Sequence, residues 1–185
     1  MNRLSILILF FLFIACKSQQ APLNTDYDNI SNNSQLKDLD NIYPKFAGVW
    51  TANIGDKQVK LVIDKVENIQ MNVGLKSYYS DALLVRYEIR INGIVKESSL
   101  NLPNSDVTII SDSPENLNSV LFFYEGGICK VGWGSIMIDY IGSTKLRWNY
   151  IPESSVLTNQ NCPNYPANGI DILLPYEPEN IIFTS

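Results

Sequence analysis

Residues 83–93 read LLVRYEIRING, and this stretch decides the fold class. Apolar residues at its odd positions alternate with largely polar residues at its even positions, which is the period of a strand with one buried face. The Asn92-Gly93 pair at its end is the strongest short hairpin signal, because both turn residues must adopt positive φ. We therefore predict a half-buried strand over 83–91 that turns directly into a second strand over 94–100.

The same two-residue period continues over most of the chain after Pro44. Glycine-containing turns, among them Gly55-Asp56, separate the apolar runs. We predict further strands at residues 46–53, 57–66, 106–110, 119–124, 129–140 and 145–151, and a final edge strand at 181–183. This many short strands joined by tight turns predict an all-β fold, which is an antiparallel up-and-down barrel or a strongly curved sheet.

One short helix is predicted ahead of these strands. Apolar residues recur at helical spacing after the capping candidates Asn33 and Ser34, and Pro44 ends the pattern. The apolar residues are Leu36, Leu39, Ile42 and Tyr43. The preceding residues are mostly polar and cannot bury enough surface to offset chain entropy. We therefore predict a flexible tether over 16–33 and a single barrel-like domain over 34–185.

The N terminus has the three parts of a secretory signal peptide. These are the basic Arg3, the apolar run over 4–15, and a small residue, Ala15, directly before Cys16. The apolar run is too short to span a bilayer as a helix. We therefore predict that residues 1–15 are a signal peptide and that the mature protein leaves the cytoplasm.

The segment Phe13-Ile14-Ala15-Cys16 resembles a bacterial lipobox, with phenylalanine in place of the usual leucine. The resemblance implies lipidation of Cys16 after cleavage and attachment to a membrane of the cell envelope. Several acyl chains together anchor a protein stably, since each buried methylene contributes about 0.8 kcal/mol. Lys17 after the cysteine resembles a sorting signal for the outer membrane. The alternative is an ordinary signal peptide that happens to end beside a cysteine.

Composition excludes several classes of chemistry. The chain contains no histidine, which removes Ser-His and Cys-His catalysis and His-zinc sites, and we predict neither a cofactor nor a metal. Its formal net charge of −5 argues against a nucleic-acid partner. Export makes a disulfide between Cys129 and Cys162 plausible. The alternative is a buried apolar Cys129 and a separate loop thiol at Cys162.

The segment Phe46-Ala47-Gly48-Val49-Trp50 opens the first long strand and carries a resemblance. It resembles the Gly-x-Trp signature of lipocalins and fatty-acid-binding proteins, the calycin barrels. The resemblance implies that Gly48 allows close backbone approach, that Trp50 plugs the closed end of a barrel beneath the short helix, and that Arg147 stacks on Trp50. The plain alternative is that Trp50 is one core aromatic among several.

The chain as a whole also resembles a family of short, uncharacterised bacterial lipoproteins. Members share the lipidated cysteine, the polar tether, this first strand and a Tyr-Tyr-x-Asp-x-Leu segment, which here is Tyr78-Tyr79-Ser80-Asp81-Ala82-Leu83. That resemblance implies no activity.

Aromatic residues on the later strands are candidates for a ligand site. Trp133, Trp148, Tyr150 and Tyr87 could line a cavity if they face inward. In small barrels such side chains also simply fill the interior. Tyrosines on the outer face could instead bind a protein partner.

Carboxylates are the remaining acid-base groups. The pairs Asp38 with Asp40, Glu177 with Glu179, and Glu125 with Asp139 are interpreted as solvated surface charge. We therefore expect a membrane-anchored, non-catalytic binding module in the cell envelope, for a small apolar ligand or a protein partner. The alternatives are a carboxylate-dependent hydrolase acting on envelope sugars or lipids, and a structural or inhibitory envelope protein.

Overall fold

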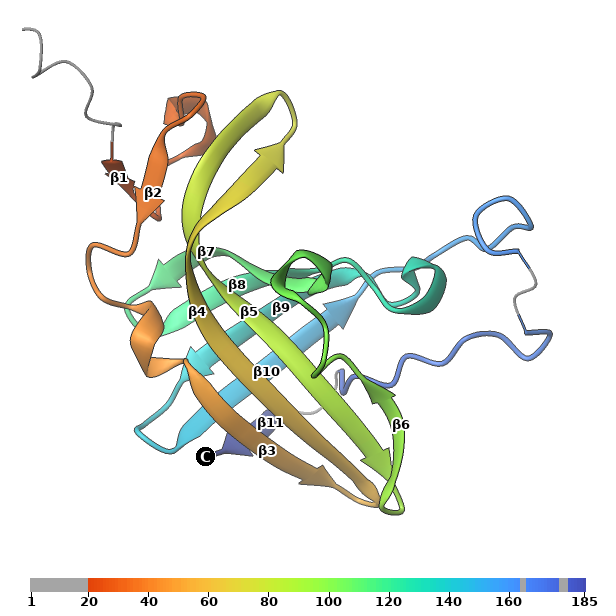
Figure 1. The fold of residues 1–185 in the computed structure, drawn as a ribbon. Coiled ribbons are helices and arrows are strands. Elements are labelled where there is room, and N and C mark those ends of the chain that lie inside the picture. The colour runs from red at the N-terminus through yellow and green to blue at the C-terminus, as the bar shows by residue number, and fades with distance from the viewer. Residues whose placement is uncertain (1–19, 164–165, 177–179) are drawn as a thin grey trace, which may run out of the picture.

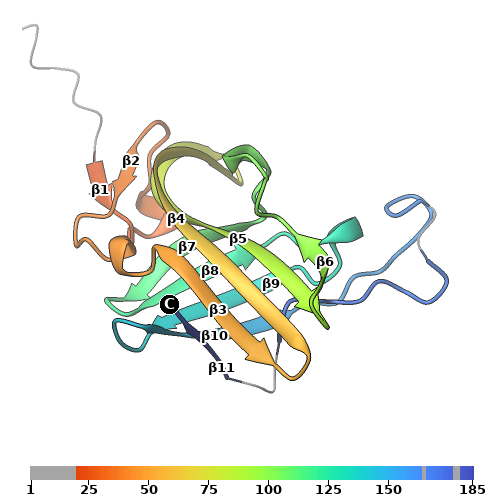
Figure 2. The ribbon, with the colours of Figure 1, turned by 60° about the horizontal axis from the view of Figure 1, so that its bottom comes forward.

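The computed structural model describes residues 20–163, 166–176 and 180–185. They form an antiparallel eight-stranded barrel, so the predicted all-β barrel is confirmed. The barrel strands are β3 (Gly48–Ile54), β4 (Lys57–Val73), β5 (Lys76–Ile91), β7 (Ile109–Asn116), β8 (Ser119–Tyr124), β9 (Gly134–Tyr140), β10 (Lys145–Pro152) and β11 (Ile181–Thr184). In Figure 2 the wall of β3, β4 and β5 lies in front of the wall of β7 to β10.

Strand β5 connects most of the structure (Figure 1). One of its edges pairs with β4 along the whole strand. Its other edge pairs in succession with β2 (Gln35–Lys37), with β7 and with β6 (Ile94–Ser98). The β7 pairing, Leu84 with Ile110 and Val85 with Ile109, closes the barrel.

The outer face of β5 is also buried, although the alternation predicted a polar face. Leu84 and Arg86 both face away from the interior and are nonetheless covered. The segment that contains the short 3-10 helix η4 (Asn104–Asp106) covers this face. Arg86 donates to Asp64 at 2.7 Å, to the carbonyl of Leu102 at 2.9 Å and to Asn104 at 2.6 Å. These partners satisfy the buried guanidinium, which sequence alternation alone could not predict.

The predicted edge strand at 181–183 lies inside the sheet. Strand β11 pairs with β10 on one side and with β3 at Thr51 on the other. Ile181 and Phe183 are buried in the core, whereas Ile182 faces outward. The strand itself is confirmed, but so short a segment carries no sign of whether one or both of its edges are paired.

The helix predicted over 34–43 is wrong. Residues 35–37 form β2, and the 3-10 helix η3 (Tyr43–Lys45) follows the turn. The Asp38 carboxylate accepts the backbone N–H groups of Ile42 at 2.7 Å and Tyr43 at 3.0 Å. Such side-chain bonds to the backbone compete with helix formation, and they turn the chain here. Leu39, which the helical pattern would bury, is 61% exposed.

The flexible tether is wrong for residues 20–33. This arm contains β1 (Gln20–Pro22), which pairs with β2, and the 3-10 helix η2 (Tyr27–Asn29). Its Leu23 and Ile30 are buried in the core. Cys16 and the predicted signal peptide lie outside the described residues. Among the residues that are described, no helix is long and apolar enough to cross a membrane.

Trp50 lies at the barrel end where η3 covers the start of β3. Its indole N–H donates to the carbonyl of Phe46 at 2.9 Å, and the indole is only 3% exposed. Phe46 and Tyr43 are fully buried beside it in the same core cluster. Gly48 has a φ of +143°, which side chains with a Cβ rarely adopt. A 3-10 turn therefore takes the place of the predicted helix at this end of the barrel.

Replacing the plug tests this part of the core. We expect Trp50→Ala to lower the free energy of unfolding by about 3 to 5 kcal/mol, because it empties a large aromatic site. Urea denaturation of the mature protein measures the change. Trp133→Ala is the matched control, since Trp133 is 37% exposed and lies outside the core cluster. A Trp50→Ala change below about 0.5 kcal/mol would show that Trp50 does not close the barrel.

Candidate functional site: the mouth of the barrel

The end of the barrel opposite Trp50 is called the mouth. Here β3, β5, β8 and β10 end, and β4, β7, β9 and β11 begin. Two loop segments cross it. The first is the 126–133 loop, which contains the 3-10 helix η5 (Ile128–Lys130), and the second is residues 170–176, called the strap.

The predicted lining residues separate into two groups. Trp148, Tyr150 and Tyr87 face the interior, where all three are buried. Trp133 lies outside, with its ring 6.3 Å from that of Phe123. Its prediction as a lining residue is wrong because β9 begins only at Gly134, so the strand alternation does not extend to Trp133.

Side chains fill the barrel interior. Trp148 contacts Phe183 at 5.8 Å and Tyr150 at 6.4 Å between ring centroids, and Tyr150 contacts Tyr124 at 5.9 Å. These rings pack with the equally buried Phe122 in one core cluster. These aromatic residues could line a cavity or fill the interior, and the structure shows that they fill it. A ligand site must therefore lie at an end or on the outer face.

Phenols form a polar chain below the mouth. The Tyr87 hydroxyl donates its one proton to the Glu97 carboxylate. The hydroxyl groups of Tyr87 and Tyr124 lie 3.2 Å apart, so the proton of that bond must come from Tyr124. Tyr150 donates separately to the carbonyl of Gly132. The chain of bonds therefore runs from Tyr124 through Tyr87 to Glu97.

A β-bulge aims Glu97 at this chain. In the β5–β6 pairing Val95 lies opposite Arg90, but Glu97 lies opposite Ile89, so Lys96 is the extra residue. Paired residues point to the same face of a sheet, and Ile89 points into the core. The bulge therefore turns Glu97 towards the interior side, and Lys96 stays exposed.

A pocket of about 430 Å³ lies between β6, the 126–133 loop and the strap. Its polar lining comes from Glu97, Tyr124, Lys96 and Asp171. Its apolar lining comes from Ile91, Ile128, Val131, Ile170, Ile172, Leu173 and Leu174. The volume and this mixture are typical of small-molecule sites.

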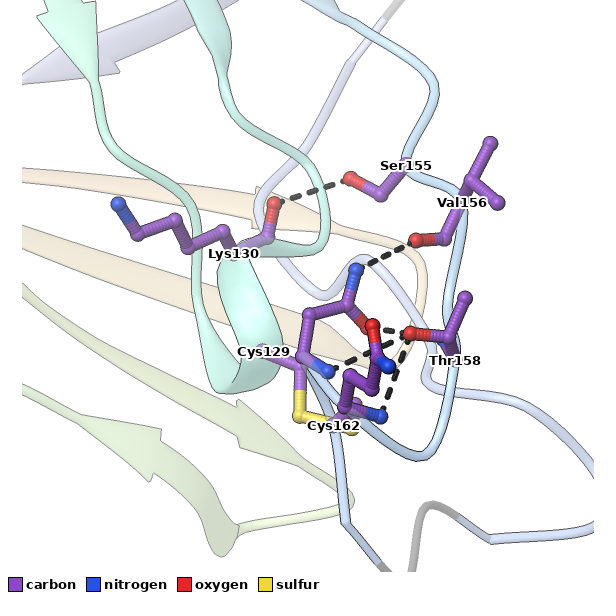
Figure 3. The surroundings of a disulfide bond; sticks show 8 residues. Cys129, Lys130, Ser155, Val156, Thr158 and Cys162 are labelled. Atoms are coloured by element: carbon purple, nitrogen blue, oxygen red, sulfur yellow. Dashed lines mark hydrogen bonds between the residues drawn. A yellow bond between two sulfur atoms is a disulfide. The ribbon is translucent and has the colours of Figure 1, made fainter.

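Hydrogen bonds and a disulfide hold the walls of this pocket. The ammonium of Lys57 donates to the strap carbonyl of Leu173, and the indole of Trp148 donates to that of Pro175, both at 2.9 Å. Cys129 and Cys162, left open as a pair or as two thiols, are joined by a disulfide with Cα atoms 5.4 Å apart (Figure 3). The bond ties η5 to the long segment that leads to the strap.

Burial raises the pKa values of the phenols at the mouth. For Tyr87, Tyr124 and Tyr150, desolvation is the largest cause, and the negative charge of Glu97 adds to it. The phenols therefore stay protonated at neutral pH and act as hydrogen-bond donors. The sequence patterns singled out neither Glu97 nor Tyr124. For Glu97 the reason is that one unpaired residue in β6 changes which side chain faces inward.

The carboxylates predicted as solvated charge have different environments. The side chain of Asp38 is fully buried, and its carboxylate accepts a hydrogen bond from Lys65 at 3.1 Å besides those from two backbone N–H groups, so its interpretation as surface charge is wrong. Beside it, Asp81 accepts Lys37 at 2.8 Å and the backbone N–H groups of Asp38 and Asn68. Burial raises the pKa of Asp81, but these donors together lower it below its ordinary value. The pair ties the N-terminal arm to the β4–β5 hairpin.

The predicted pair of Glu125 and Asp139 does not share a cleft. Asp139 pairs with Ser119 at one end of the β8–β9 ladder, and Glu125 follows Tyr124 at the other end. Glu177 and Glu179 lie outside the described residues. Within the described residues, no cluster of three His, Cys, Asp or Glu side chains could hold a metal ion.

The expected stacking of Arg147 on Trp50 is wrong. Arg147 faces outward, in register with Ile182, and its guanidinium lies 3.5 Å from the Asp139 carboxylate. Trp50 points into the core, so the sheet separates the two side chains.

The buried phenols predict an alkaline limit to stability. Their pKa values in the folded state exceed the ordinary value of about 10, so the unfolded state loses these protons first. Their contribution to stability is full below about pH 10 and is lost as the pH rises above it. We expect the free energy of unfolding to fall above pH 10, with the buried tyrosines ionising only as the chain unfolds. Phenolate absorbance and circular dichroism measure the two events, and ionisation of all ten tyrosines with the fold intact would contradict the prediction.

Comparison with known proteins gives a family but no activity. No curated protein and no solved structure matches the chain. The sequence model of a family of unknown function, DUF6705, matches residues 1–134. The match includes β3 to β8, Glu97 and the 126–133 loop, and it ends before the strap. Because it covers well over half of the sequence, the chain belongs to the DUF6705 family.

Proposed function

We propose that this protein is an envelope-anchored, non-catalytic binding module whose small ligand occupies the mouth pocket. The observation that carries the proposal is the contrast between the filled barrel interior and the pocket of about 430 Å³ at its mouth. Apolar side chains from three segments converge there with Glu97 and Tyr124. Compared with a calycin barrel, the ligand site moves from inside the barrel to its end.

The buried carboxylates of Asp38 and Asp81 support binding without catalysis. A glycosidase-type hydrolase needs one carboxylic acid with a raised pKa and a second carboxylate across the same cleft. Asp38 and Asp81 are instead saturated by lysines and backbone N–H groups. The donors also lower the pKa of Asp81, which is the wrong direction for a general acid.

The anchor at Cys16 would hold the protein close to the membrane. The described part of the arm begins at Gln20, and four residue steps from Cys16 can span at most about 15 Å. The arm pairs with β2, which in turn pairs with β5 at Tyr79 and Ser80, whereas the pocket begins at Ile91, roughly 35 Å further along the strand. Figure 1 shows β1 and β2 at one end of the molecule and the β3–β4 turn at the other. The mouth would therefore face away from the membrane.

The outer face supports a protein partner as a second candidate function. Phe123 and Trp133 are exposed next to each other, with exposed Ile151 two strands away from Phe123 in the same row. Grooves open on both sides of Phe123. A structural or inhibitory envelope protein would use such a face.

The anchor is tested by removing its attachment site. We expect the Cys16→Ala variant, expressed from its full-length gene, to lose the lipid and to leave the membrane fraction, because no acyl chain remains to hold it. Mass spectrometry of the fractions detects both changes. Unchanged membrane retention of Cys16→Ala would contradict lipid anchoring at this residue.

The mouth is tested with six-carbon probes that differ only in the head group: hexylammonium, 1-hexanol and hexanoate. We expect at least one of them to shift the amide resonances of Ile128, Val131 and Ile172 in the isotope-labelled mature protein. Val131→Trp fills the pocket and should abolish binding. Val156→Trp is the control on an exposed loop and should leave it unchanged.

If Trp133→Ala abolishes probe binding and Val131→Trp does not, the outer face is the site. If no probe binds, the proposal of a small-ligand site at the mouth is wrong.

A further inference from the structure

The geometry of the mouth points to a ligand with a positively charged ammonium head on an apolar body, and Glu97 is the residue that binds the head. This inference rests on the proposed function, because it assumes that the mouth pocket holds a small ligand.

The Glu97 carboxylate has unused bonding capacity. Its one hydrogen bond within the described residues comes from the Tyr87 hydroxyl to Oε1. Over those same residues, none of the ion pairs includes Glu97. Asp38 and Asp81, by contrast, each accept from a lysine and two backbone N–H groups. Oε2 of Glu97 is therefore free to accept from a ligand in the pocket.

The charge of the pocket favours a cation. Glu97 and Asp171 contribute two carboxylates to the lining, and Lys96 contributes one ammonium on the exposed side of the bulge. The phenols of Tyr87 and Tyr124 stay neutral and cannot offset the carboxylates. A carboxylate or phosphate head would be repelled by Glu97, whereas an ammonium would form a charge-assisted hydrogen bond with it.

The walls fit an aliphatic body. Ile91 on β5, Ile128 and Val131 in the 126–133 loop, and Ile172 and Leu174 in the strap line the space beside Glu97. Burying a short alkyl chain against these side chains stabilises the complex by roughly 0.8 kcal/mol for each methylene that leaves water. A fully polar cation would lose this contribution.

A second reading of Glu97 is protection of the β6 edge. Strand β6 pairs only with β5 among the described strands, and inward-pointing charges on edge strands discourage association between sheets. In that reading Glu97 has no preference among head groups. A measured preference among head groups therefore distinguishes ligand binding by Glu97 from protection of the β6 edge.

The test is the affinity of hexylammonium, 1-hexanol and hexanoate for the mature protein, measured by amide shifts at the mouth. We expect hexylammonium to bind at least about tenfold more tightly than 1-hexanol, and hexanoate to bind most weakly. Glu97→Gln should lower the hexylammonium affinity about tenfold and leave the 1-hexanol affinity unchanged. The amide oxygen of the variant still accepts the Tyr87 hydroxyl, so the fold should persist, and a thermal melt checks this.

Glu125→Gln is the matched control, because Glu125 is an exposed carboxylate directly after β8 and outside the mouth pocket. It should leave all three affinities unchanged. Equal binding of 1-hexanol and hexylammonium, or an equal loss in both variants, overturns the assignment of Glu97 while the mouth remains a small-ligand site. Absence of any binding overturns the assignment together with the proposed function.

Discussion

Strand β5 has two edges of hydrogen-bonding groups, and the division of these edges among its partners positions every other part of the molecule. One edge is used entirely by β4. The other is shared by β2, β7 and β6, so the N-terminal arm, the barrel seam and the mouth follow one another along a single strand. Both faces of β5 are covered in its middle part, from Leu83 to Tyr87. Arg86, with Asp64, Leu102 and Asn104 as partners, is the polar group that makes the outer cover possible.

The mouth depends on this division through one irregularity. Where β6 takes over from β7, the extra residue Lys96 shifts the register by one position. A one-residue shift exchanges the two faces of a strand, so a carboxylate replaces a lysine opposite Ile89. The neutral phenols of Tyr87 and Tyr124 then hold that carboxylate at the edge of a filled core. Because this core is filled, the proposed ligand site lies at the end of the barrel.

Much of the fold could be predicted because it rests on local signals. Alternation from Leu83 to Ile91 and the Asn92-Gly93 turn predicted the hairpin and β6 to within two residues, whereas β5 begins at Lys76, seven residues before its predicted start. Prediction failed where tertiary contacts compete with local pattern. The Asp38 carboxylate turned an apparent helix into a strand and a turn, and pairing with β2 ordered the arm around Leu23 and Ile30. The candidate site was harder to predict than the fold. Glu97 faces the core only because of the bulge in β6, and Trp133 lies outside the core because β9 begins only at Gly134.

The most direct test of this account is a crystal structure of the mature protein with hexylammonium. We expect the ammonium within about 4 Å of the Glu97 carboxylate, the alkyl chain between Val131 and Ile172, and an unchanged aromatic core. An alkyl chain inside the barrel, with Trp148, Phe122 or Phe183 displaced to admit it, would contradict the filled interior and the assignment of the site to the mouth.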